Sequence, residues 1–389
     1  MRILHCCLAN FYIDDYGYQE NILTKFHQLH GHQVKILAST ETYLPNKQLG
    51  YVKPSKYRTK DDIPIVRIAY SKYLPSFLGK KVRKYEGTLE EVKNFNPDLI
   101  FIHGCQFWDL IKVVRYAKNK NIKVFADSHT DYFNSAKTWI SKNLLHKGLY
   151  GYLIRKADHG IQKYFATLPT RKDFFVDVYK IREEKIHFLP FGVDDSDLNL
   201  HDYQKLRENA RKELNIKNNE FVIISGGKLD DRKNIHLLIK CYNKLKKDPL
   251  FKSIRFILFG QPVPEMEQEI SSLLQGSDII YFEWIKANKI KYTLLAADLT
   301  IFPGTHSVLW EESIGLGIPG IFRKWHGIDH IDLGGNCKWL YNGTEEEIMD
   351  TFCEVFKNKH LFDSMKSTAI KMGPKHFSYS EISKKAIKF

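Results

Sequence analysis

The chain has 389 residues, of which 43% are hydrophobic and 27% are charged, the composition of a folded globular protein. This length exceeds one ordinary hydrophobic core and predicts two domains. The 59 basic and 45 acidic residues give a formal charge of +14, which favours an anionic partner such as nucleotide phosphates, nucleic acid or an anionic membrane surface.

The six cysteines are scattered without the CxxC spacing of zinc sites, so neither structural zinc nor a disulfide framework is expected. No run approaches the ~18 apolar residues of a membrane-spanning helix, and the first residues resemble a buried strand more than a signal peptide. We therefore expect a soluble, cytoplasmic protein that can still bind the inner face of a membrane.

In the first half, short apolar runs alternate with amphipathic stretches. The expected strands are residues 3–9, 33–38, 65–69, 99–103, 123–127 and 185–189. We expect helices at residues 19–30, 89–94, 109–119 and 144–156, and a polar loop or insertion at 40–62. Strand, helix, strand in this order predicts right-handed crossovers and a parallel sheet.

A polar stretch follows residue 194, and the alternation then restarts. Strands are expected at 221–225, 254–259, 279–282 and 299–302, and helices at 203–214, 235–246, 264–274, 287–296 and 310–316. We therefore predict an α/β protein with two Rossmann-like, doubly wound domains, 1–195 and 196–376, and a C-terminal helix at 377–389 that packs back on the first. Open parallel sheets bind ligands beyond the carboxyl ends of their strands, so the loops there should carry the chemistry.

The strongest motif follows strand 221–225 and reads Gly226-Gly227-Lys228-Leu229-Asp230-Asp231-Arg232-Lys233-Asn234. Glycines let the backbone approach a phosphate closely, and lysines neutralise its charge. Basic residues at a helix N-terminus oppose the macrodipole, which favours a bound anion, although a solvated turn with a charged helix start explains the same residues. The loop is neither a P-loop nor GxGxxG, so those nucleotide folds are not indicated.

A second motif joins strand 299–302 to a short helix and runs from Phe302 to Ser313, followed by Gly317-Ile318-Pro319. Glu311 and Glu312 lie near the helix N-terminus, where carboxylates are favourable for structural reasons alone. The functional interpretation is that one of them accepts hydrogen bonds from vicinal ribose hydroxyls, a task for which its two oxygens are suited.

Together these segments resemble family 4 of the retaining GT-B glycosyltransferases, and the likeness covers nearly the whole chain. The matching segments are residues 17–20, 31–34, 98–104, 127–129, 186–194, 227–233 and 310–319. Each is weak alone, but their order and spacing are specific. The resemblance implies an N-terminal acceptor domain and a C-terminal nucleotide-sugar donor domain that face each other across a cleft.

By this resemblance, Lys228 and Lys233 would grip the donor diphosphate and stabilise the leaving nucleotide, and His129 would face the reacting side of the sugar. The backbone at 282–285 would hold the base of a UDP- or GDP-linked sugar. Basic side chains neutralise the leaving group in this family, so neither a metal nor another cofactor is expected, and electrostatic stabilisation is the main catalytic term. The implied donor-binding residues are Gly17, Gly227, Trp284, His306, Ser307 and the ribose-binding Glu312.

Three positions depart from the family pattern. Lys228 replaces the usual Arg, giving a point charge in place of a bidentate fork. Gly304 stands eight residues before Glu312, where the family has an acidic residue that contacts the donor sugar. Asn234 occupies a usual glycine position. Without this acidic residue, the contact with the donor sugar is either absent or made by Thr305, His306 or Ser307.

Structural explanations compete with functional ones at several polar residues. His103, at an apolar strand end, is interpreted as a satisfied structural histidine. His129 follows a strand in a polar segment and fits either role. Glu20 is as suited to stabilising its helix N-terminus as to binding a ligand, and Trp310 is expected to pack in the core.

Residues 80–84 and 144–156 mix cations with apolar side chains. An ordinary solvated helix face is one explanation. The functional alternative is a peripheral patch for anionic lipid, which a lipid-linked acceptor would rationalise.

The expected function is retaining, metal-independent transfer of a hexose to a glycan or lipid-linked acceptor in surface or secreted glycan synthesis. The alternatives are a catalytically degenerate GT-B partner subunit, a nucleotide-sugar epimerase of the same fold, and a basic nucleic-acid-binding protein. The cations are dispersed through both halves without an aromatic-basic RNA motif, so nucleic acid is not an expected partner.

Overall fold

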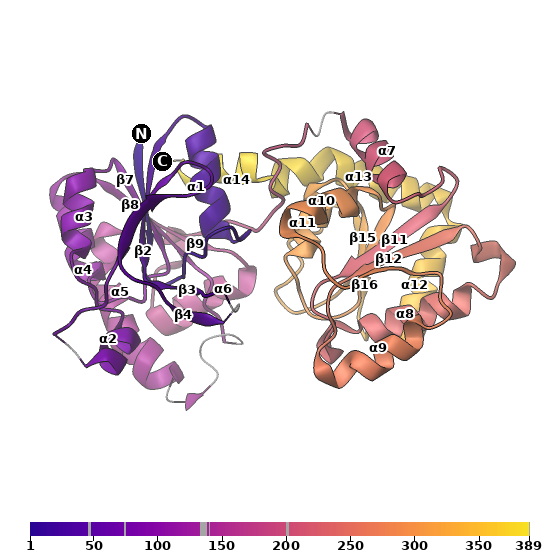
Figure 1. Ribbon diagram of the computed structural model, residues 1–389, viewed down its shortest axis with the longest axis horizontal. Helices are drawn as coiled ribbons and strands as arrows, with labels where there is room; N and C mark the ends of the chain where they lie inside the picture. The colour runs from indigo at the N-terminus through magenta and orange to yellow at the C-terminus, as the bar shows by residue number, and fades with distance from the viewer. Residues whose placement is uncertain (46–47, 74, 133–137, 140, 200–201, 389) are drawn as a thin grey trace. The chain divides into compact units, whose positions relative to one another are not determined.

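The computed structural model describes residues 1–45, 48–73, 75–132, 138–139, 141–199 and 202–388. The chain forms two compact units, one of Met1–Pro190 with Ser383–Phe389 and the other of Phe191–Ile382 (Figure 1). The division lies near the predicted boundary after residue 195. Of the tail expected to return to the first domain, the part from Ser383 onward belongs to the first unit.

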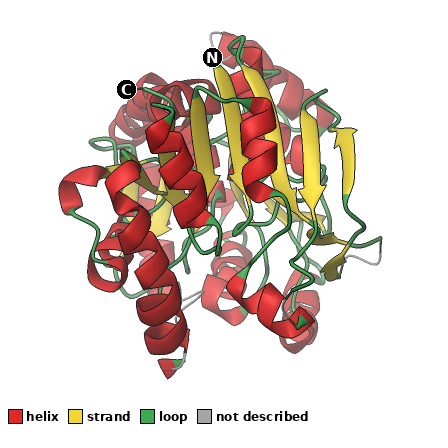
Figure 2. Cartoon of the chain, turned by 90° about the vertical axis from the view of Figure 1, so that its left-hand side faces the viewer, coloured by secondary structure: helices red, strands yellow, loops and turns green. Residues whose placement is uncertain are grey.

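The first unit contains an eight-stranded sheet in the order β10-β9-β8-β7-β1-β2-β6-β5. Every neighbouring pair is parallel except β5 with β6. Figure 2 shows this unit facing the viewer, with helices on both sides of its strands. The strands are β1 (Arg2–Cys7), β2 (Gln33–Ser39), β5 (Ser55–Arg58), β6 (Pro64–Ile68), β7 (Leu99–His103), β8 (Lys123–Ser128), β9 (Lys163–Ala166) and β10 (Ile186–Phe188).

Helix α4 of the first unit buries one apolar stripe. In α4 the buried side chains are Leu110, Val113, Val114 and Ala117, the i, i+3, i+4, i+7 spacing of one helix face. The expected helix 144–156 begins at Ser141 as a π-helical stretch, Ser141–Tyr150, before α5. The α-helices are α1 (Gln19–Leu29), α2 (Ser76–Val82), α3 (Thr88–Phe95), α4 (Leu110–Asn119), α5 (Gly151–Ala157) and α6 (Pro169–Phe174).

The polar segment 40–62 was expected to be a loop or an insertion, and the structure shows that it is not simply a loop. It contains β3 (Glu41–Tyr43) paired antiparallel with β4 (Leu49–Tyr51), and β5 at the sheet edge. These strands have three or four residues and mostly exposed or half-buried side chains, so they carry no apolar alternation to recognise. β5 adds one antiparallel edge strand to the predicted parallel sheet.

The second unit contains a six-stranded, fully parallel sheet in the order β13-β12-β11-β14-β15-β16. Its helices are α7 (Tyr203–Glu213), α8 (Ile235–Leu245), α9 (Glu267–Leu274), α10 (Ala287–Leu295), α11 (Leu309–Gly315), α12 (Glu345–Lys357) and α13 (Lys359–Phe377). The strands are β11 (Phe221–Gly226), β12 (Ile254–Phe259), β13 (Ile280–Phe282), β14 (Leu299–Phe302), β15 (Gly320–Arg323) and β16 (Cys337–Leu340).

The C-terminal segment was expected to be one helix over residues 377–389. Instead Phe377 ends the 19-residue α13, and α14 (Tyr379–Ala386) follows. Ser378 separates the two helices with an extended backbone, φ −88° and ψ 138°. None of the described helices has the length and apolar character of a membrane-spanning segment.

Strand order reverses once in each sheet. In the second unit β12 and β13 lie to one side of β11, and β14, β15 and β16 to the other. In the first unit the reversal falls between β1 and β7. Crevices at such switch points, beyond the carboxyl ends of the strands, are where open α/β sheets bind ligands. The loops after β1, β7, β11 and β14 are therefore the places to examine for a site.

Candidate functional site

In the second unit, the loops after β11, β12 and β14 meet at the carboxyl edge of the sheet. Gly227 follows β11 with φ +107°, a conformation that suits glycine. A Cβ at Gly227 would lie 3.4 Å from Leu309 Cδ1 and 3.9 Å from Ser307 Oγ, whereas one at Gly260 would overlap the Gly227 carbonyl. The glycines thus let three backbone segments come together at the switch point.

Lys233 is built into this edge. Its Nζ donates hydrogen bonds to the carbonyl oxygens of Thr305 at 2.8 Å and His306 at 2.7 Å, which ties the β11 loop to the β14 loop. Burial lowers the pKa of Lys233 to about 8, although Asp230 acts in the opposite direction. Lys228 is exposed and forms no ion pair with any other described residue, so its ammonium is available to an anion.

Gly304 has a packing explanation. A Cβ at this position would overlap the carbonyl oxygen of Arg232 and the backbone of Lys233. The loop 303–305 is therefore packed directly on the β11 loop, and Thr305 N donates to the Arg232 carbonyl at 2.9 Å. An acidic side chain at residue 304 would need a different loop conformation.

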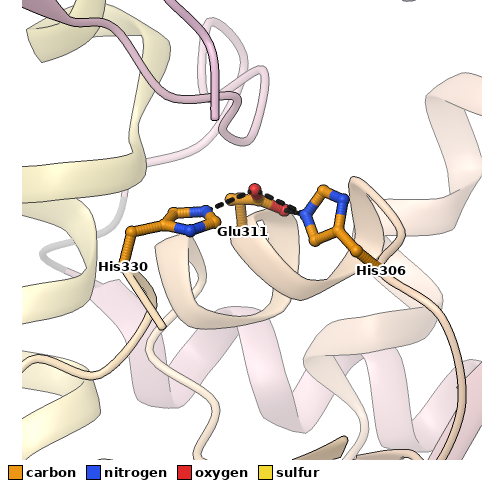
Figure 3. A group of neighbouring side chains, drawn as sticks. All are labelled: His306, Glu311 and His330. Carbon is orange, nitrogen blue, oxygen red and sulfur yellow. Dashed lines mark hydrogen bonds and ion pairs between the residues drawn. The ribbon is translucent and has the colours of Figure 1, made fainter. Parts of the chain in front are cut away.

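A buried carboxylate joins the loops after β14 and β15 (Figure 3). His306 Nε2 donates to Glu311 Oε1 at 2.8 Å, and His330 Nε2 donates to the same oxygen at 2.8 Å. The ring of Trp310 packs edge-on against His306, with centroids 5.2 Å apart. Burial alone would raise the pKa of Glu311, but the two histidines outweigh it and lower that pKa to about 2. Glu311 therefore stays ionised and fixes both imidazoles.

Two histidines and a carboxylate are also a ligand set for transition metals. The ligand atoms of His306, Glu311 and His330 lie within 4.8 Å of one another. The nitrogen–oxygen separations of 2.8–3.1 Å are, however, those of N–H···O hydrogen bonds, which account for the arrangement without a metal. From the sequence, Glu311 was expected either to stabilise the helix N-terminus or to bind the ribose. Its partner His330 was not predicted, because 19 residues separate the two.

The other predicted donor residues of the second unit follow strands of its sheet at the same edge. Glu312 lies in α11, where burial, with Glu311 and Asp194 adding to it, raises its pKa to about 8 despite Lys291. Trp284 follows β13, and 72% of its surface is exposed. All six strands are parallel, so the loops carrying Lys228, Trp284, His306 and Glu312 emerge at one edge.

In the first unit, Gly17 and His129 follow β1 and β8. A Cβ at Gly17 would meet no atom within 4 Å, so this exposed loop has room beside it. His129 Nε2 lies 3.9 Å from Asp127 Oδ2. Burial lowers the pKa of His129 to about 4, although Asp127 opposes it.

Behind His129, buried polar side chains form a continuous line. Asp127 Oδ2 lies 2.6 Å from His103 Nδ1, and His103 Nε2 lies 2.9 Å from His5 Nδ1. His5 Nε2 lies 2.9 Å from His27 Nδ1, and His27 Nε2 lies 3.0 Å from the Ser383 carbonyl oxygen. The prediction that His103 is a satisfied, buried histidine is confirmed. The partners His5 and His27 were missed because their separations in sequence show no pattern.

Glu20 lies beside this line, at the start of α1. Burial raises its pKa to about 7, and His103 and Asp127 act on it in opposite directions. Glu20 Oε2 and Asp127 Oδ1 are buried without a hydrogen-bond partner among the described residues. The carboxyl edge of the first sheet therefore holds two buried carboxyl groups and two histidines, His103 and His129.

Two Rossmann-like units with ligand edges of this kind define the fold as GT-B. The sequence model "Glycosyltransferase Family 4" matches residues 20–197, and "Glycosyl transferases group 1" matches residues 207–319. The chain belongs to family 4 of the GT-B glycosyltransferases. A comparison with curated protein sequences finds no match.

Solved structures agree on the fold. The chain is 16% identical to Alr3699/HepE of Anabaena in complex with UDP, with a TM-score of 0.65 over 99% of this chain and 98% of that one. WaaG, a glycosyltransferase involved in lipopolysaccharide biosynthesis, is 15% identical with a TM-score of 0.63 at the same coverage. The UDP-GlcNAc 2-epimerase of Neisseria meningitidis is 16% identical with a TM-score of 0.61, again over 99% and 98%.

Proposed function

We propose that this glycosyltransferase moves a hexose, with retention, from a UDP- or GDP-linked donor to a glycan or lipid-linked acceptor. The observation that carries the proposal is the meeting of the β11 and β14 loops at the switch point of the second sheet. There Gly227 lies beside Ser307 and beside Leu309 in the helix that holds Glu312, and Lys233 donates to two carbonyls of the β14 loop. Lys228 follows Gly227 in the same loop. UDP bound to the Anabaena neighbour supports a nucleotide donor.

In this proposal, Lys228 and Lys233 neutralise the diphosphate as the bond to the sugar breaks, so that no metal is required. Charge that develops on the departing nucleotide is stabilised by cations already in place, the term that dominates such reactions. Glu312 accepts hydrogen bonds from the ribose. In its ionised form its carboxylate offers two acceptor oxygens. Trp284 is placed to cover the base.

The donor sugar would be held by the β14 loop. His306 cannot rotate freely, because Glu311 holds its Nε2 and Trp310 packs on its ring. With Nε2–H donated to the carboxylate, the Nδ1 atom of His306 is left for a hydrogen bond with a sugar hydroxyl. Ser307 adds a hydroxyl. His306 and Ser307 would then make the contact with the donor sugar that an acidic residue at 304 makes in the family.

In the first unit, Gly17 leaves room for the donor sugar and His129 faces the acceptor side. We propose no carboxylate nucleophile. The anomeric configuration is then retained because the acceptor attacks the sugar on the same face from which the nucleotide departs. We propose that the enzyme acts in the synthesis of a surface or secreted glycan.

Nucleotide binding tests the donor site directly. We expect UDP or GDP to raise the unfolding temperature of the protein, because a ligand that binds only the native state stabilises it. Lys228→Ala should weaken this binding, whereas Lys252→Ala, an exposed lysine elsewhere in the second unit, should not. Equal binding by both variants would remove the proposed phosphate site.

Epimerisation of a nucleotide sugar is the second candidate. Glu20 and Asp127 are two buried carboxyl groups near His103 and His129, and acid–base chemistry at a sugar carbon needs such groups. The Neisseria epimerase shares the fold. Incubation with UDP-GlcNAc separates the candidates, because an epimerase yields a new UDP-sugar without any acceptor, and a transferase does not.

We also propose peripheral contact with anionic lipid. Tyr150 donates to the Lys81 carbonyl at 2.6 Å, so the two basic stretches of the sequence adjoin in space. Large apolar side chains on this part of the first unit are exposed, among them Trp139, Leu144 and Tyr152. Co-sedimentation with vesicles containing anionic lipid should exceed that with neutral vesicles, and equal sedimentation would contradict the proposal.

A further inference from the structure

The first unit contains a line of three imidazoles that runs from the ligand edge of its sheet to its C-terminal segment. Asp127 lies in β8, His103 at the end of β7, His5 in β1 and His27 in α1. All four side chains are 0% exposed. The far end is the carbonyl of Ser383, the residue at which the chain re-enters the first unit.

When His5 and His27 are both neutral, the hydrogen bonds allow one assignment of protons to this line. A carbonyl oxygen only accepts, so His27 Nε2 carries hydrogen and donates to Ser383. Neutral His27 then accepts at Nδ1 from His5 Nε2–H, and neutral His5 accepts at Nδ1 from His103 Nε2–H. His103 Nδ1 donates to the Asp127 carboxylate. Each hydrogen bond in the line contains one hydrogen. A further proton on His5 or His27 would place two hydrogens between one pair of atoms and break that hydrogen bond.

Electrostatics supports the same assignment. Burial, with the charges of His27 and His103, lowers the pKa of His5. Burial, with His32, His30 and His103, also lowers the pKa of His27, although its hydrogen bond to the Ser383 carbonyl acts in the opposite direction. Burial also acts to lower the pKa of His103, but Asp127 and Glu20 outweigh it and raise that pKa. The Asp127 carboxyl group, in turn, has a lowered pKa because His103 outweighs burial. The line therefore ends in an imidazolium–carboxylate pair.

The titratable groups around the three imidazoles favour the same distribution of charge, with the proton on His103. Glu20 faces His103 and Asp127, and His129 faces Asp127. Arg171 faces His129, and the thiols of Cys7 and Cys105, whose pKa values burial raises, lie near Asp127. At the other end, His30 and His32 face His27 and disfavour a charge on it.

We propose that His5, His27 and His103 are positioning residues that fix the Asp127 carboxylate beside His129 and tie this ligand edge to the C-terminal segment. The part concerning His129 rests on its proposed role in transfer. The three imidazoles do not touch substrate. They act by removing alternative tautomers, so that the carboxylate has one charge and one orientation, and by holding α14 through the Ser383 carbonyl.

Nitrogen-15 NMR of protein labelled at histidine tests the assignment without any substrate. At pH 7 we expect His103 to carry hydrogen on both nitrogens, and His5 and His27 to be neutral with hydrogen on Nε2. A neutral His103, or a charged His5 or His27, overturns the proposal even if the enzyme is active. Failure of every nucleotide sugar to react would instead refute the proposed function and leave this result standing.

Two substitutions of His27 test whether the line of histidines holds the C-terminal segment. Gln at residue 27 can accept from His5 and donate to Ser383, whereas Leu can do neither. In His27→Leu we expect amide exchange at 383–388 to become about tenfold faster, the scale of a lost buried hydrogen bond, and the His103 titration to shift. His27→Gln should restore both, and His159→Gln, at an exposed histidine of the same unit, should change neither.

Equal exchange and equal His103 titration in the Leu and Gln variants would overturn the tie between the two ends of the line. If His27→Leu does not fold, the comparison of wild type with His27→Gln decides, because the proposal requires those two proteins to match at His103. In transfer assays, His27→Leu should lower kcat about tenfold with little change in the KM for donor, since the donor edge lies in the other unit.

Discussion

The buried histidine line makes a quantitative prediction about stability and pH. His27 is fully buried, and burial lowers its pKa from 6.5 to about 3. The unfolded chain therefore binds one more proton than the folded chain between those two pH values. The stabilising contribution of neutral His27 is fully present above about pH 6.5 and is lost as the pH falls toward 3. Between pH 7 and pH 5 this one group should cost about 2 kcal/mol of unfolding free energy.

The substitution His27→Gln isolates that contribution, because Gln does not titrate but can keep both hydrogen bonds. We expect the variant to lose about 2 kcal/mol less than the wild type between pH 7 and pH 5. Urea unfolding read by pulse proteolysis, scored on peptides from the first unit, measures this difference. His159→Gln serves as the control. An unchanged pH dependence in His27→Gln would show that His27 is not held neutral by burial, and the proton assignment would fail with it.

Three further predictions concern the second unit. Gly304→Glu should destabilise it by about 3 kcal/mol in urea unfolding, because a side chain there overlaps the backbone of the β11 loop. Glu311→Leu should cost about 3 kcal/mol by leaving two buried imidazole N–H groups unpaired, while Glu346→Leu on the exposed face of α12 should cost little; equal losses would contradict the role of the trio. UDP should bind about tenfold more weakly at pH 9 than at pH 7 as Lys233 loses its proton near pH 8, and Lys233→Arg should abolish this dependence in calorimetric titrations.

The fold was predictable from sequence wherever a strand is buried on both faces. β7 and β14 are wholly buried, and their bounds coincide with the predicted ranges. β9 was missed because its first residue, Lys163, is polar and half-buried, which leaves only three apolar residues, too short a run to indicate a strand. Three- and four-residue edge strands such as β5 are specified by their partners in the sheet.

The candidate site was predictable where one loop carries the whole signal, as with Gly227, Lys228 and Lys233. It was not predictable where contacts join distant segments. Nothing in the sequence links Glu311 to His330, or His27 to the backbone of Ser383, since a carboxylate that accepts from two histidines and a carbonyl that accepts from one have no local pattern. The packing reason for Gly304 likewise depends on Arg232 and Lys233, some seventy residues earlier in the chain.

The first unit consists of two separate segments, Met1–Pro190 and Ser383–Phe389, and this has a consequence for biosynthesis. Residues Phe191–Ile382 are contiguous, so the second unit can complete its core as soon as they have left the ribosome. The first unit is made earlier but lacks the Ser383 carbonyl and the buried side chains of Ala386 and Ile387 until residues 383–388 have been made. During that interval His27 has a buried donor with no acceptor. A nascent chain stopped after residue 382 should therefore show protease-sensitive α1 next to a folded second unit.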